Sequence, residues 1–227
     1  MKMRAYIDSK VFWSTLNAFL NESVFPAYSE DTTGHGEDHI RDVMSWTVRL
    51  SEGMMEQRKR ILCLVAAAYH DISITTMGRE NHHMDSATML REAQRDLHSW
   101  FSFSEIGVMV KAVEDHRASK VRMPRSKIGT VLSDADRAPS IDLKSLIHRT
   151  WDFRRTQHPE WGLDEMAQDM HRHIFKKYGR DGYCLFKLEK TEKILGPIKR
   201  QIERVAERPD EIKALVETYL LTGSLSW

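Results

Sequence analysis

The sequence predicts an all-α protein, because helical spacing of apolar residues recurs throughout, strand-like alternation is scarce and helix-breaking residues are few. Six prolines and eleven glycines are spread over 227 residues, and long amphipathic segments lie between them. Hydrophobic residues make up 41% of the chain and charged residues 30%, a balance that supports a packed core and argues against disorder. A chain of this length suits one large helical domain, or a domain with a helical extension.

The first 140 residues are expected to form a helical core. A first helix is expected over residues 9–24, and a second begins near Gly36. The third, over residues 55–69, is apolar on nearly every face and should therefore be central and buried. After a loop that contains Gly78, the remaining helices of this part are expected over 81–97, over 104–116 and from residue 127 onward.

Beyond Pro139 the pattern changes to longer amphipathic segments. Helices are expected there over residues 141–156, 163–177, 184–206 and 210–221. We therefore expect residues 1–140 to be the core that carries the chemistry, and residues 141–227 to be a helical extension packed on that core. The two parts are expected to form one structural unit.

Charge and cysteine content narrow the classes of function. The net charge is +1, from 34 Lys and Arg against 33 Asp and Glu, so there is no strong signal for nucleic-acid binding. No segment is apolar for long enough to cross a bilayer, and the amino terminus lacks the apolar stretch of a signal peptide. The two cysteines, Cys63 and Cys184, form no CxxC pair. A cytoplasmic protein without a membrane partner is the expectation.

The residues that carry chemistry begin with His70 and Asp71, which end an almost purely apolar run. Burying an imidazole and a carboxylate without a partner is costly, so something should compensate them. His39 adjoins the apolar stripe of the second expected helix, and Asp134 and Asp136 lie on the helix that begins at residue 127. These side chains can converge on a divalent ion, since imidazole and carboxylate together suit Mn²⁺, Fe²⁺, Co²⁺, Ni²⁺, Zn²⁺ and, less well, Mg²⁺.

Four segments resemble, in order, those of the HD-domain superfamily of metal-dependent phosphohydrolases, and in particular its small bacterial members: GHGEDHIRDV, LVAAAYHDI, HHMDSA and VLSDADRA. The resemblance covers roughly residues 33–138. It implies a compact HD-domain helical bundle with additional C-terminal helices. It also implies that one divalent metal ion, or the first of two, is bound by His39, His70, Asp71 and Asp136.

The resemblance favours Asp136 over Asp134, because the family's ligand is the Asp that precedes Arg. Asp134 is instead expected to support the site, for example by holding a ligand imidazole. His35 is expected to belong to a turn and to bind no metal, and His82 is expected to face solvent.

The mechanism implied is hydrolysis by a metal-activated water, with Asp71 as both ligand and proton acceptor. His83 and His116 are the next catalytic candidates. In dinuclear members such histidines, here drawn from His82, His83 and His116, bind a second metal, and in mononuclear members they contact phosphate or water. Both alternatives stay open. Cations should stand near the phosphoryl group, and the candidates are Arg41, Arg117, Lys120, Arg122, Arg125 and Lys127.

The expected substrate is a small phosphorylated metabolite, and a nucleotide in particular. After DADR the sequence continues APSID, where the bacterial subgroup usually has a Leu-Asp-Ala type segment, so substrate choice stays open. The extra histidines also allow a dinuclear-iron oxygenase of the HD fold. A third hypothesis is a non-catalytic module that senses a nucleotide or binds a protein.

Overall fold

The computed structural model describes residues 10–29, 34–117 and 122–222. These residues form helices joined by turns, without a strand among them, which confirms the all-α prediction. Packing divides the chain into two units, the first ending at Asp136 and the second beginning at Arg137. This division falls a few residues before the boundary predicted at residue 140.

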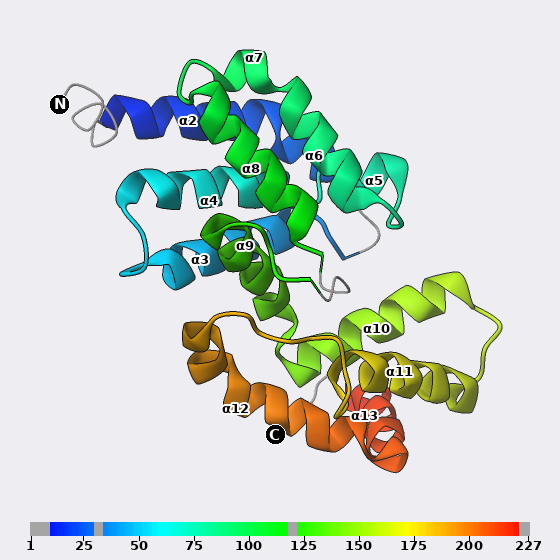
Figure 1. Ribbon diagram of the computed structural model, residues 1–227. Helices are drawn as coiled ribbons and strands as arrows, with labels where there is room; N and C mark the ends of the chain where they lie inside the picture. Colours follow the sequence, from blue (N-terminus) through cyan, green and yellow to red (C-terminus); the bar gives the residue numbers. More distant parts are fainter. Residues whose placement is uncertain (1–9, 30–33, 118–121, 223–227) are drawn as a thin grey trace. The chain divides into compact units, whose positions relative to one another are not determined.

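The first unit surrounds one buried helix. Its elements are α2 (Lys10–Ser23), η1 (Phe25–Tyr28), α3 (Glu37–Ser51), α4 (Gln57–Tyr69), α5 (Ile74–Met77), α6 (His82–Glu92), α7 (Gln94–Leu97), α8 (Phe103–Asp115) and nearly all of α9 (Lys127–Arg137). Helix α4 contacts α3 on one side and α8 on the other, and α6 packs against α8 (Figure 1).

Helix α4 is the rigid centre of this unit. Its second half is buried along almost its whole length, as its apolar sequence predicts. The small side chains of residues 66–68 let neighbouring helices approach its last turn closely. The buried Tyr28 hydroxyl donates a 2.8 Å hydrogen bond to the Ala68 carbonyl and so anchors that turn to η1. Whatever follows Tyr69 therefore starts from a fixed position.

Three expected boundaries were wrong, each for a local reason. The expected loop around Gly78 contains the short helix α5, which ends where Gly78 adopts a φ of 81°. The single helix expected over 81–97 is broken at Ala93, whose ψ of 1° leaves the helical range. The helix expected from residue 184 begins only at Glu189, because the Cys184 N–H bonds the Lys177 carbonyl at 2.9 Å and extends the preceding turn instead.

The second unit has its own core. It contains η2 (Ala138–Ser140), α10 (Leu143–Gln157), α11 (Leu163–Tyr178), α12 (Glu189–Ala206) and α13 (Pro209–Thr222). Helix α11 contacts α10, α12 and α13 and buries its apolar face among them. The Tyr178 hydroxyl at its end lies 2.8 Å from Ser140 Oγ in η2.

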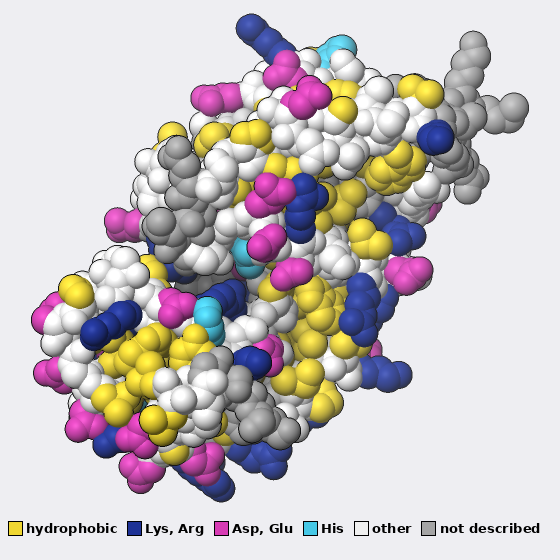
Figure 2. All heavy atoms as spheres, turned by 180° about the vertical axis from the view of Figure 1, so that it is seen from behind, with side chains coloured by type: hydrophobic (Ala, Val, Ile, Leu, Met, Phe, Trp, Pro, Cys, Tyr) yellow, Lys and Arg dark blue, Asp and Glu magenta, His cyan; other side chains and the backbone are white. Residues whose placement is uncertain are grey.

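The surface carries both signs of charge. Figure 2 shows acidic and basic side chains interspersed over the face it presents. Within the part of the chain that the structure describes, no single helix is both long enough and apolar enough to cross a bilayer.

Candidate metal centre

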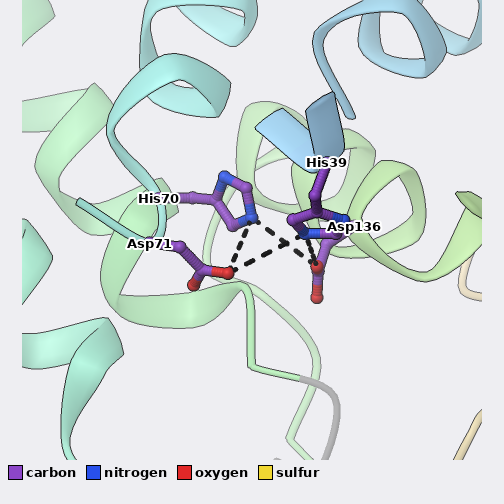
Figure 3. A group of neighbouring side chains, drawn as sticks. All are labelled: His39, His70, Asp71 and Asp136. Atoms are coloured by element: carbon purple, nitrogen blue, oxygen red, sulfur yellow. Dashed lines mark ion pairs between the residues drawn. The ribbon is translucent and has the colours of Figure 1, made fainter. Parts of the chain in front are cut away.

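Four side chains from three helices meet at the end of α4 (Figure 3). His70 and Asp71 directly follow α4, His39 lies in the first turn of α3, and Asp136 lies near the end of α9. Their candidate ligand atoms all lie within 4.8 Å of one another. The structure thus brings together the four residues predicted from the sequence, and it places Asp136, not Asp134, in the group. We call this the first group.

The first group alternates imidazole nitrogen and carboxylate oxygen. Asp71 Oδ2 lies 3.3 Å from His70 Nε2 and 3.8 Å from His39 Nε2. Asp136 Oδ1 lies 3.5 Å from His39 Nε2 and 3.6 Å from His70 Nε2. His70 and Asp71 are buried, with 0% and 1% of their surfaces exposed. The four atoms therefore enclose a small space at the edge of the core.

A second group shares Asp71. The other carboxylate oxygen, Asp71 Oδ1, lies 3.4 Å from His82 Nε2 and 3.4 Å from His116 Nε2. These three residues also offer ligand atoms within 4.8 Å of one another. One carboxylate therefore faces histidines on both of its oxygens, which is the arrangement that a bridging carboxylate would need.

Backbone carbonyls fix the orientation of three of these imidazoles. In each, Nδ1 lies close to the carbonyl oxygen three residues earlier: His70 to Ala67 at 2.7 Å, His82 to Arg79 at 2.8 Å and His116 to Val113 at 2.6 Å. A carbonyl only accepts, so each Nδ1 must carry the hydrogen and donate it. The neutral ring then presents a lone pair at Nε2, and each of these Nε2 atoms faces Asp71.

This arrangement fits a divalent cation. Lone pairs that face a carboxylate need a proton or a cation between them, because two acceptors do not bond each other. Both ring nitrogens of His39, Nε2 of His70 and Oδ1 of Asp71 are buried without a hydrogen-bond partner among the described residues. Leaving such atoms unsatisfied is costly. An ion in the first group would satisfy Nε2 of His39 and Nε2 of His70, and an ion in the second group would satisfy Oδ1 of Asp71. The imidazole and carboxylate donors suit Mn²⁺, Fe²⁺, Co²⁺, Ni²⁺ or Zn²⁺.

The carboxylates of the first group are held in the charged state. Burial alone would raise the pKa of Asp71, but His70, His35 and His116 outweigh it and hold that pKa well below its usual range. The same balance lowers the pKa of Asp136, where burial is opposed by His39 and His70. Both side chains are therefore anionic at neutral pH, as metal ligands must be.

The imidazoles divide into two kinds. Burial lowers the pKa of His39 and of His82, so both are neutral at neutral pH and ready to bind a metal. His70 differs, because Asp71 and Asp136 outweigh its burial and raise its pKa well above the ordinary value. Without a metal, His70 therefore retains a proton on Nε2, and an ion must displace that proton to bind there.

The prediction that His82 faces solvent was wrong. Only 13% of its side chain is exposed, and its Nε2 belongs to the second group. Helix α6 begins at His82, and successive helical residues point about 100° apart, so His82 and His83 cannot both face Asp71. His83 is buried on another side and lies outside both groups. His82 thus takes the position that the sequence suggested for His83.

His35 has a contact that sequence reasoning missed. It precedes α3, as expected for a turn residue, but its Nδ1 lies 2.7 Å from Asp71 Oδ2 and its Nε2 lies 2.9 Å from the Arg79 guanidinium. The contact joins residues 36 positions apart in the sequence, so no local pattern indicates it. The one signal the sequence offered was that His35 lies four residues before the ligand candidate His39.

The basic residues predicted to contact the phosphoryl group differ in the partners they have in the structure. Arg41 donates to Glu37 at 2.7 Å and lies over the Phe25 ring, and Arg125 donates to Asp115 at 2.9 Å. Both guanidinium groups are therefore engaged by carboxylates. Arg117 donates instead to the Glu80 carbonyl, in the loop that leads to His82. The other candidates are Arg122 and Lys127, which are exposed, and Lys120, which lies outside the described residues.

Fold and site together define an all-α domain with a buried cluster of His and Asp side chains that could hold a metal ion. Residues 36–138 match the family model of the HD domain, a span that contains both groups. This span of the chain therefore carries an HD domain, the domain that gives the HD-domain superfamily its name.

The chain is also similar to a crystal structure of a predicted HD superfamily hydrolase from an uncultured Thermotogales bacterium. The identity is 24%, the match covers 71% of this chain and 87% of the other, and the TM-score is 0.49. A search of curated proteins found no match.

Proposed function

We propose that this chain is a metal-dependent phosphohydrolase that acts on a small phosphorylated metabolite, with a nucleotide as the expected substrate. One observation carries the proposal: both oxygens of Asp71 face histidine Nε2 atoms that backbone carbonyls hold ready as ligands. Such a carboxylate can hold one ion in the first group, or two ions side by side. The HD-domain match supports the hydrolytic class.

The residues around the candidate metal site have different roles in the proposed reaction. When bound, a divalent ion lowers the pKa of a water molecule and polarises a phosphoryl oxygen. Asp71 serves as a ligand, and its charged carboxylate also keeps the role of proton acceptor that the sequence suggested. His116 remains a candidate for binding a second metal or the phosphate, and His82 takes the role that the sequence suggested for His83.

We assign the phosphate contact to Arg117. Its guanidinium donates to the Glu80 carbonyl, next to the segment that carries Arg79 and His82. A cation there could stabilise charge that develops on the phosphoryl oxygens. Arg41 and Arg125 are less suited, because each would first have to leave a carboxylate.

The test starts from protein stripped with a chelator and resupplied with Mn²⁺, Co²⁺, Ni²⁺ or Mg²⁺. A panel of nucleotides and phosphate esters should then include a substrate, and Asp71→Ala should abolish its hydrolysis. His98→Ala is the matched control, since His98 is an exposed histidine of the same unit. Nucleotide binding without turnover under every metal would contradict the proposal and favour a non-catalytic module.

A dinuclear-iron oxygenase is the second candidate, and the second group is the observation that favours it. Two irons per chain, with oxygen consumed in the presence of a substrate, would support this reaction. A single ion per chain, or phosphate release without oxygen uptake, would count against it.

A further inference from the structure

We propose that Arg79 is a positioning residue of the metal centre, which holds the imidazoles on both sides of Asp71. The inference rests on the proposed function, because it concerns the same site. Arg79 lies in the loop between α5 and α6. Its guanidinium lies 2.9 Å from His35 Nε2, and its backbone carbonyl lies 2.8 Å from His82 Nδ1. One residue thus contacts both histidines.

The side chain of Arg79 fixes the tautomer of His35. A guanidinium only donates hydrogen bonds, so His35 Nε2 must accept, and the ring hydrogen must lie on Nδ1. Nδ1 is the atom that lies 2.7 Å from Asp71 Oδ2. The hydrogen bonds therefore run in one direction, from Arg79 to His35 and from His35 to Asp71. This sequence of donors holds the Asp71 carboxylate in one orientation.

The backbone of Arg79 acts on the other oxygen. Its carbonyl accepts the hydrogen of His82 Nδ1, so the lone pair of His82 Nε2 faces Asp71 Oδ1 at 3.4 Å. The side chain thus orders the contact to Oδ2, and the main chain orders the contact to Oδ1. A displacement of this residue would disturb both sides of the carboxylate at once.

The loop that carries Arg79 is itself held. Gly78 has a φ of 81°, and its N–H bonds the Ile74 carbonyl at 3.2 Å. Arg117 donates to the Glu80 carbonyl on the other side of Arg79. Arg79 is exposed, whereas His35 is half-buried and Asp71 is buried, so the donors lead from the surface into the centre.

Without the guanidinium, Asp71 alone would favour the hydrogen on Nδ1 of His35, and nothing at Nε2 would hold the ring in place. The ring could then turn away from Asp71 Oδ2, and the carboxylate would be oriented less firmly. Removing an outer partner of a metal ligand typically lowers metal affinity or activity about 10- to 100-fold. Because Arg79 acts on a ligand of the metal and not on the substrate, we expect kcat to fall and KM to change little.

The first experiment compares three full-length variants by titration with Co²⁺ or Mn²⁺. Arg79→Met keeps the stem and removes the donors, and we expect affinity to fall about 10- to 100-fold. Arg79→Lys keeps a donor and should lose less. Arg91→Met is the control, because Arg91 is an exposed arginine of α6 that pairs with Glu114 at 3.2 Å. Wild-type affinity in Arg79→Met would overturn the inference.

The second experiment is a double-mutant cycle with His35→Ala. If Arg79 acts through His35, the double variant should bind metal and turn over no worse than His35→Ala alone. Additive losses, or a KM that rises with kcat unchanged, would overturn the inference and place Arg79 against the substrate. His35→Asn, which retains an amide donor, should be milder than His35→Ala.

The same measurements separate this inference from the proposed function. If the wild-type chain binds no divalent ion, the proposed function fails. If the wild-type chain binds metal and hydrolyses a phosphate while Arg79→Met behaves like it, only the role of Arg79 fails.

Discussion

His70 and Asp71 are adjacent in the chain, yet they face different surroundings. His70 turns Nδ1 to the carbonyl of Ala67 in the last turn of α4, so the geometry of the helix end orients its ring. Asp71 depends on residues from distant segments, His35 and His116 among them. The dipeptide could therefore be recognised from the sequence, because an apolar helix that ends in His-Asp is a local pattern. The residues from distant segments that contact Asp71 could not all be recognised in this way.

The first prediction follows from the fact that Asp71 belongs to both the first and the second group. Asp71→Asn keeps the size of the side chain and removes its charge, so ions in both groups should be lost together. His116→Ala should remove an ion only from the second group. Metal content per chain after dialysis, with Co²⁺ or Mn²⁺, measures both. An Asp71→Asn protein that keeps one tightly bound ion would show that the carboxylate is not shared.

The raised pKa of His70 gives a pH dependence. The protonated ring must give up a proton when an ion binds, so metal affinity should rise with pH until the pH exceeds that pKa. The pKa values of His39 and His82 are lowered, so at neutral pH neither ring carries a second proton that a metal ion would have to displace. Titration calorimetry between about pH 5.5 and 8, in buffers of different ionisation enthalpy, measures affinity and proton release together. Constant affinity with no proton released would contradict this assignment.

At the scale of elements, periodicity predicted the long helices that position the site, including α3, α4, α8 and α9. It could not predict where α6 begins, because one position of difference decides whether His82 or His83 faces Asp71. It also could not predict α5, a helix of one turn whose end depends on the backbone of Gly78. These misses concern loops and helix starts, where a few hydrogen bonds outweigh propensity.

Helix α8 begins with a cap that an ion pair reinforces. Ser102 and Glu105 form a capping box, and Arg58 of α4 donates to both Glu105 oxygens at 2.6 and 2.7 Å. The hydrogen bonds from Arg58 lower the pKa of Glu105 from 4.5 to about 2. Because the pKa is lowered, this contribution to stability is present above pH 4.5 and is lost as the pH falls towards about 2.

Glu105→Gln should therefore destabilise the protein at neutral pH. We expect the free energy of unfolding to fall by about 1 to 2 kcal/mol, an estimate reduced for the solvent that screens this partly exposed pair. Urea denaturation of both proteins at pH 7 and near pH 3 measures the effect, and the difference between them should shrink at the lower pH. A difference independent of pH would assign the effect to packing.

A substitution at Gly78 tests whether the loop that carries Arg79 depends on the backbone conformation of a glycine. Its φ of 81° with ψ of −178° is a conformation that only glycine adopts without strain. Gly78→Ala should lower the free energy of unfolding by about 1 to 3 kcal/mol, although the space around it is open. Gly107→Ala is the matched control, since Gly107 is helical with equally open space, and there we expect a gain of about 0.5 to 1 kcal/mol. Equal effects in denaturant unfolding would exclude backbone strain at Gly78.

At the scale of the whole molecule, the candidate ligands all belong to one unit. Both groups lie within residues 39–136, in the first unit, and the second unit has a separate core around α11. From the change of pattern near Pro139, the sequence predicted a boundary at residue 140, within a single structural unit. The sequence does not reveal how strongly the two cores unfold together.

The two cysteines can measure this, because each unit contains one and neither is exposed. Burial raises the pKa of Cys63 to about 12, so a thiol reagent at pH 8 should react only after α4 is uncovered. Metal at about 100 times its Kd should slow labelling of Cys63 about 100-fold, since it stabilises only the closed form. The labelling rates are followed in Cys184→Ala, which retains Cys63, and in Cys63→Ala, which retains Cys184. Cys184 should be protected much less, because its unit contributes no ligand, and equal protection of both thiols would show that the two units open as one.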